Sequence, residues 1–159
     1  METLGAMKDN PITGVGNLVA SAARMQPAAP PRTYLGVAYG MLPGVKALAV
    51  ANPTAPLALC LVAAHALECT LKAYLSRDGN DDVVKRPDIR HNLVALWKLA
   101  HIQGLRIPAD PPGWVEMLGH LHNSPYYLRY STGVHGIQSP ASEPMTTELG
   151  QLLNLVEQS

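Results

Sequence analysis

Aromatic residues are scarce in this sequence, and phenylalanine is absent. Tryptophan and tyrosine together make up 5% of the chain. Aromatic and β-branched side chains favour strands, so their scarcity argues against a large sheet. The core must therefore be built mainly from leucine, alanine, valine and methionine, and leucine and alanine favour helix. We expect an all-α protein.

Charge is also scarce, and neither sign is in excess. Charged residues make up 15% of the chain, compared with about 25% in an average soluble domain. Twelve lysine and arginine residues balance twelve aspartate and glutamate residues, so the net charge is zero. A strongly basic nucleic-acid-binding arm is therefore excluded, although a small local basic site is not. A surface so poor in charge favours coverage by a partner subunit.

The chain has only two cysteines, Cys60 and Cys69, and no Cys-x-x-Cys motif. Their spacing along one helix corresponds to about 13.5 Å, whereas a disulfide needs Cα atoms within about 7 Å. The two thiols therefore cannot pair within a helix, which is typical of a reducing compartment. The first residues show no signal-peptide pattern, so we expect a cytoplasmic protein.

One stretch of the chain, between Lys46 and Glu68, contains no charged residue. A membrane helix needs about 20 mostly apolar residues. Residues 52–56 interrupt this stretch with an asparagine, a threonine and two prolines, and proline breaks a helix interior. The stretch therefore predicts two buried helices joined by a turn, and no membrane partner.

The remaining sequence divides into a short arm and a helical domain. Residues 1–32 carry scattered glycine and proline and predict a loosely packed arm. Residues 33–159 predict an up-and-down bundle of four to five helices. The apolar spacing places these helices at 34–50 with a kink or a break near Pro43, 57–77, 88–103, from about 112 onward, and 143–157. We expect Gly79 to end the second helix, and Asp88 and Ser142 to cap the third and the last.

Three polar residues lie along one stripe of the predicted helix 57–77. His65, Glu68 and Lys72 occupy positions i, i+3 and i+7, which share a face of a helix. Two interpretations remain open, namely a solvated ion pair between Glu68 and Lys72 and a functional polar seam. We expect His91, near the start of the next helix, to be neutral and to make a structural hydrogen bond.

Histidine spacing gives no indication of a metal. His120 and His122 are two residues apart, so on a helix they point to different faces, whereas zinc sites on a helix use histidines at i and i+4. No cysteine-rich ligand set is present. We therefore expect neither a metal site nor a cofactor.

The densest functional candidate is the segment 126–135, which holds three tyrosines, Arg129 and His135. An arginine and a histidine among tyrosines can hold a phosphate and stack a base. In a metal-free RNA cleavage, His135 would move the proton of the 2′-hydroxyl, and Arg129 would stabilise charge at phosphorus. The structural alternative is that the tyrosines pack the end of the bundle and Arg129 complements a helix C-terminus.

Three segments together resemble the HEPN family (higher eukaryotes and prokaryotes nucleotide-binding). Residues 64–75 read AHALECTLKAYL and resemble a core helix that often carries Ala-Leu-Glu-x-x-Leu-Lys-Ala. His91-Asn92-Leu93 is similar to the start of a later HEPN helix, and Tyr127-Leu128-Arg129-Tyr130 is similar to an Arg-Tyr element near the domain end. Their order and spacing agree over roughly residues 34–157.

The resemblance implies a small helical bundle, usually a homodimer, that in many members contacts nucleotides or RNA. Several members are metal-independent ribonucleases of toxin–antitoxin or phage-defence systems, with the signature Arg, four to six residues, then His. Arg129 and His135 match this signature with five residues between them. On this basis Arg129 and His135 are the expected catalytic pair.

The resemblance also suggests which residues line the ligand site. The expected ligand-binding residues are Tyr127 and Tyr130, with His65, Glu68 and Lys72 as a polar seam facing them and His91 as its support. Many HEPN-like proteins keep the Arg-Tyr element without cleaving RNA. The alternative function is therefore a non-catalytic interaction module that partners a nucleotidyltransferase-type antitoxin or a larger complex.

Overall fold

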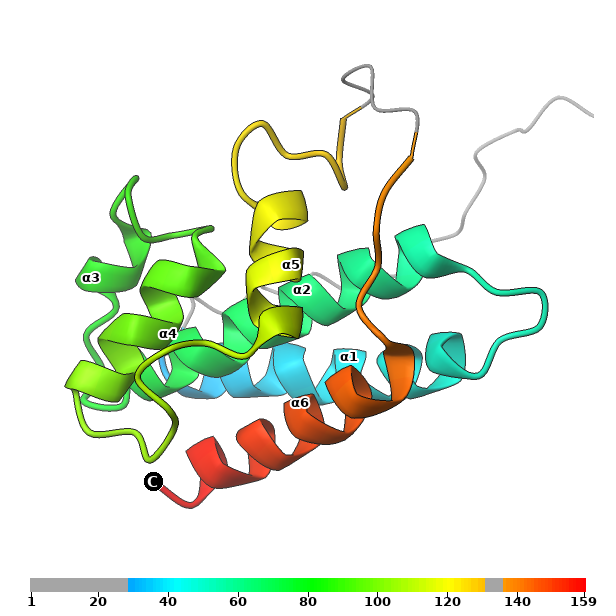
Figure 1. Ribbon diagram of the computed structural model, residues 1–159. Coiled ribbons are helices and arrows are strands. Elements are labelled where there is room, and N and C mark those ends of the chain that lie inside the picture. The colour runs from blue at the N-terminus through cyan, green and yellow to red at the C-terminus, as the bar shows by residue number, and fades with distance from the viewer. Residues whose placement is uncertain (1–28, 131–135) are drawn as a thin grey trace, which may run out of the picture.

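The computed structural model describes residues 29–130 and 136–159, where all regular structure is helical (Figure 1). The six helices in this part of the chain are α1 (Arg32–Ala49), α2 (Pro56–Leu75), α3 (Asp82–Lys85), α4 (Leu93–Ile102), α5 (Gly113–His122) and α6 (Ser142–Glu157). The prediction of an all-α protein is confirmed. Most of the predicted arm, residues 1–28, lies outside the described part, and α1 begins at the arm's last residue.

Three long helices lie side by side, and the shorter helices pack around one of them (Figure 1). α1 and α2 form an antiparallel pair joined by the turn at residues 50–55, and α6 contacts both. α4 and α5 pack against α2 and against each other, with α5 standing across the direction of α2 (Figure 1). The two buried helices expected on either side of residues 52–56 are confirmed.

α1 is one continuous helix that includes Pro43. A break at this position was one of the expected outcomes, and it does not occur. Proline removes one helical hydrogen bond and crowds the preceding turn, but Pro43 lies on the exposed side of α1. The opposite side buries Ala38 and Val45, so packing keeps the helix intact across the proline.

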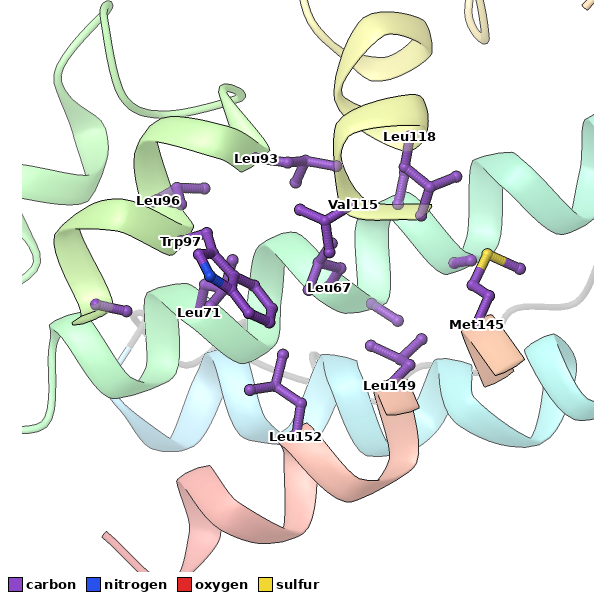
Figure 2. Packing of buried hydrophobic residues seen from close by; sticks show 14 of the residues in the cluster. Leu67, Leu71, Leu93, Leu96, Trp97, Val115, Leu118, Met145, Leu149 and Leu152 are labelled. Carbon is purple, nitrogen blue, oxygen red and sulfur yellow. The ribbon is translucent and has the colours of Figure 1, made fainter. Parts of the chain in front are cut away.

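α2 is the central helix of the fold, since it contacts each of the other five. It is long and apolar enough to cross a membrane by length and composition, but 72% of its most apolar stretch is buried inside the protein. Figure 2 shows Leu67 and Leu71 of α2 among apolar side chains from α4, α5 and α6. Such burial is typical of the core helix of a helical domain.

The helix ends differ from the predicted caps in two places. The helix expected at 88–103 is α4, which begins at Leu93 rather than at residue 88, because the side chain of Asn92, not Asp88, accepts a hydrogen bond from the backbone N–H of Ala95. Asp88 pairs with Arg86 instead, and the short α3 precedes this pair. Ser142 is the first residue of α6 and makes no capping hydrogen bond. Gly79 adopts a positive φ of 90° after α2, as expected of a helix-ending glycine.

Candidate functional site

The polar stripe of α2 faces the protein interior. Glu68 is 4% exposed and Lys72 is 8% exposed. The Lys72 Nζ donates a hydrogen bond of 2.7 Å to Glu68 Oε1. The interpretation as a solvated surface pair is therefore wrong. Burying an ion pair costs desolvation free energy. Further hydrogen bonds to the pair must therefore offset that cost.

The second oxygen of Glu68 joins two histidines. Glu68 Oε2 lies 3.1 Å from His91 Nδ1, just before α4, and 2.5 Å from His122 Nε2, at the end of α5. An ionised carboxylate only accepts hydrogen bonds. Each imidazole therefore donates to it, His91 through Nδ1–H and His122 through Nε2–H. We call these four residues, Glu68, Lys72, His91 and His122, the Glu68 cluster.

The Glu68 cluster keeps its carboxylate ionised. Burial alone would raise the pKa of Glu68, but the hydrogen bonds from His122, Lys72 and His91 and the charge of Lys72 outweigh burial and lower this pKa from 4.5 to about 2. Negative charge is therefore fixed in the protein interior at neutral pH. The fully buried Nδ1 of His122 has no hydrogen-bond partner among the described residues.

An aromatic series leads from the Glu68 cluster to the surface. The ring of His91 meets those of His122 and Tyr126 edge to face, with centroids 6.1 and 5.9 Å apart. Tyr126 meets Tyr130 in the same way at 6.2 Å. The guanidinium carbon of Arg129 lies 5.9 Å from the Tyr126 ring centroid. Arg129 and Tyr130 are exposed, so the buried carboxylate is connected to an exposed cation through rings packed edge to face.

Tyr126 holds the central position in this series with an unusual backbone. Its φ is 65°, which is a left-handed conformation and a steric outlier for a bulky residue. Strain of this kind costs about 1–3 kcal/mol and persists only where the surroundings fix it. In this conformation the ring of Tyr126 contacts His91, Tyr130 and Arg129 at once. The strained residue therefore holds the exposed and buried parts of the site together.

Of the eight predicted site residues, five join the connected series, two lie apart from it, and one lies outside the described residues. The structure brings Glu68, Lys72, His91, Arg129 and Tyr130 into the connected series just described.

His65 lies one turn earlier on α2, half-buried, with Nε2 3.9 Å from Cys69 Sγ. Burial lowers the pKa of His65. The charge of Glu68 opposes this change, and the charge of Arg129 adds to it. Tyr127 instead lines a separate pocket with Met117 and His120. His135 lies outside the described residues.

Two members of the site, His122 and Tyr126, were not among the predicted site residues, although His122 was considered as a metal ligand and Tyr126 lies in the segment 126–135. His122 is 1% exposed and shares its face of α5 with the fully buried Val115 and Leu118. The spacing Val115, Leu118, His122 is i, i+3, i+7, so the sequence did carry a signal that His122 faces inward.

Comparison with models of known protein families, with curated proteins and with solved structures finds no match to this chain. The resemblance to the HEPN family therefore remains a prediction from three sequence segments. Any functional conclusion rests on the chemistry of the Glu68 cluster and of the exposed residues beside it.

Proposed function

We propose that the protein is a HEPN-like helical protein that binds the phosphate of a nucleotide or RNA at the surface formed by Arg129, Tyr126 and Tyr130. The observation that carries this proposal is the environment of Arg129. Its guanidinium is exposed beside the ring of Tyr126, which in turn packs against Tyr130, and no carboxylate of the described residues pairs with it. Its hydrogen-bond donors are thus available to a ligand.

The chemistry of this surface suits a phosphate attached to a base. A guanidinium binds phosphate through two parallel hydrogen bonds. An exposed tyrosine such as Tyr130, with 62% of its surface accessible, offers a ring on which a nucleobase can stack, worth about 1–3 kcal/mol per base. The zero net charge of the chain favours such a local site over a long electrostatic groove.

The proposal extends to a metal-independent endoribonuclease of a toxin–antitoxin or defence system, acting as a cytoplasmic homodimer. In that reaction His135 would accept the 2′-hydroxyl proton while the 2′-oxygen attacks phosphorus. The bond to the 5′-oxygen would break, and that oxygen would take up a proton. Arg129 would stabilise the charge that develops on the phosphate oxygens.

Binding and cleavage are tested separately. Fluorescence anisotropy with a labelled single-stranded RNA should show binding that weakens about tenfold or more in Arg129→Ala, because the bidentate contact is lost. Arg106→Ala, another exposed arginine, should bind like the wild type. Equal binding by all three proteins would overturn the proposal.

Cleavage is measured in EDTA with the wild type, Arg129→Ala and His135→Ala. Loss of cleavage in both variants, with the helical circular dichroism spectrum unchanged, is the result expected of the ribonuclease. Binding that depends on Arg129 without any cleavage would leave a non-catalytic phosphate-binding protein.

A different feature supports the alternative of an interaction module. Val50, Leu57 and Leu61, around the turn between α1 and α2, expose 82, 52 and 37% of their surface. Exposed apolar side chains that lie together mark contact surfaces for other proteins. A partner such as a nucleotidyltransferase-type antitoxin would cover them. Leu57→Ser with Leu61→Ser should abolish the binding of that partner and leave RNA binding unchanged.

A further inference from the structure

We propose that Glu68, His91 and His122 form a binding site for a divalent transition-metal ion, with zinc as the best-suited metal. One ligand atom from each of these residues lies within 4.8 Å of the other two. In the metal-free cluster Nδ1 of His91 and Nε2 of His122 carry the protons donated to Glu68, so an ion binds as those protons move to the other ring nitrogens or to water. The proposal does not depend on phosphate binding at Arg129, because it uses atoms of the Glu68 cluster alone.

The three ligands come from three separate elements. Glu68 projects from the middle of α2, His91 precedes α4, and His122 ends α5. In a tetrahedral zinc site with bonds of about 2.0–2.1 Å, ligand atoms are about 3.3 Å apart. The present separation between Glu68 Oε2 and His91 Nδ1 is 3.1 Å, and that between Oε2 and His122 Nε2 is 2.5 Å. The first separation therefore has to widen by about 0.2 Å and the second by about 0.8 Å, while the two imidazole nitrogens lie within 4.8 Å of each other.

The donor set selects the class of metal. Two imidazole nitrogens and one carboxylate oxygen are the ligands of many zinc sites that leave a fourth position for water or another ligand. Calcium and magnesium prefer an all-oxygen set, which this cluster lacks. Copper binds nitrogen-rich sites more tightly than zinc does, so Cu²⁺ should compete.

Lys72 plays two opposing roles in this site. Its ammonium holds Oε1 of Glu68 at 2.7 Å, which orients the carboxylate and leaves Oε2 available to the ion, as outer-shell hydrogen bonds do in metal sites. Its positive charge also repels a cation in a buried environment. Lys72 should therefore lower the affinity of the site, and removing its charge should raise that affinity.

Access to the site is from the side of His91. The side chains of Glu68 and His122 are 5% and 0% exposed, whereas that of His91 is 26% exposed. An ion must pass His91 to reach the other two ligands. Because His91 is also the least buried of the three, its replacement disturbs the core least and makes the best test of the site.

The experiment titrates the metal-free full-length protein with ZnCl₂ in an isothermal calorimeter. We expect one zinc per chain and at least about a 100-fold weaker affinity in His91→Ala. His120→Ala is the matched control, because His120 is an exposed histidine of α5 outside the cluster, and it should bind like the wild type. Lys72→Met should bind zinc at least about tenfold more tightly.

A second readout identifies the ligand geometry. Cobalt(II) bound to the wild type should give the intense visible absorption of a four-coordinate site, which His91→Ala should lose. The absence of saturable zinc binding, or equal binding by wild type and His91→Ala, would overturn the proposal and leave the cluster as a purely hydrogen-bonded network. Arg129→Ala should retain zinc binding, so failure of the phosphate site and failure of the metal site are distinguishable.

Discussion

Replacing Glu68 by glutamine removes the one negative charge of the Glu68 cluster while keeping nearly the same shape. Folding lowers the pKa of Glu68 from 4.5 to about 2. At about 1.36 kcal/mol per pH unit, this difference corresponds to about 3 kcal/mol of folding free energy. Because the folded-state pKa is the lower one, this stabilisation is complete above about pH 5 and is lost as the pH falls toward 2.

An independent argument gives the same magnitude. Glutamine leaves the ammonium of Lys72 buried, at 10% side-chain exposure, without its counter-charge. Breaking a buried ion pair by removing one partner costs about 3–5 kcal/mol. We therefore expect Glu68→Gln to be about 3 kcal/mol less stable than the wild type at neutral pH. The two proteins should approach equal stability as the pH falls to about 2, where about half of the Glu68 side chains are protonated in the folded protein.

Urea denaturation followed by far-ultraviolet circular dichroism, repeated from pH 7 to pH 2, measures this difference. Glu116→Gln, an exposed substitution on α5, is the control and should change stability by less than about 0.5 kcal/mol. A difference between wild type and Glu68→Gln that stays constant across this pH range would refute the reasoning. If the variant does not fold, NMR titration of the Glu68 carboxyl carbon in the wild type provides the test. A measured pKa near 4.5 would also refute the reasoning.

Two further predictions concern helix capping and thiol burial. Asn92→Ala should destabilise the protein by about 1 kcal/mol, because the Asn92 Oδ1 accepts a hydrogen bond from the Ala95 N–H at 3.0 Å. Asp88→Ala should destabilise the protein less. Equal losses of stability in urea denaturation would contradict the assignment of Asn92 as the cap. Burial raises the pKa of Cys69 to about 11 and also raises that of Cys60, so a chromogenic thiol reagent at neutral pH should label both only after urea unfolds the protein. Rapid labelling of the folded protein would show that these thiols are accessible.

The helices were largely predictable because their apolar residues repeat at three and four positions. The central helix was expected at 57–77 and is found at Pro56–Leu75. The caps were less predictable, because Asp88 and Asn92 are both good capping residues and local sequence does not choose between them. Tertiary packing decides between Asp88 and Asn92 as the cap. Leu93 and Leu96 are fully buried, and a helix that begins at Leu93 has Asn92 as its cap.

The candidate site was predictable only in part. The stripe of His65, Glu68 and Lys72 follows from helical spacing, but its direction does not, because α2 is apolar on nearly all sides and has no obvious solvent face. His122 was set aside because metal spacing was sought within a single helix. The Glu68 cluster draws its groups from α2, α5 and the segment before α4, and only tertiary structure brings such residues together.

The buried ion pair of α2 has a consequence for the newly made chain. Before the other helices cover it, α2 is an apolar segment of 20 residues that the translocation machinery could treat as a candidate for lateral insertion. An ionised side chain at the centre of such a helix raises its insertion free energy by about 2.5–3.5 kcal/mol. Glu68 lies in the middle part of α2, and Lys72 adds a second ionised group in its last turn. Inside the folded protein the same two charges satisfy each other and bind two histidines. The Glu68–Lys72 pair thus disfavours insertion of α2 into lipid. The same helix is stable in the interior of the folded protein.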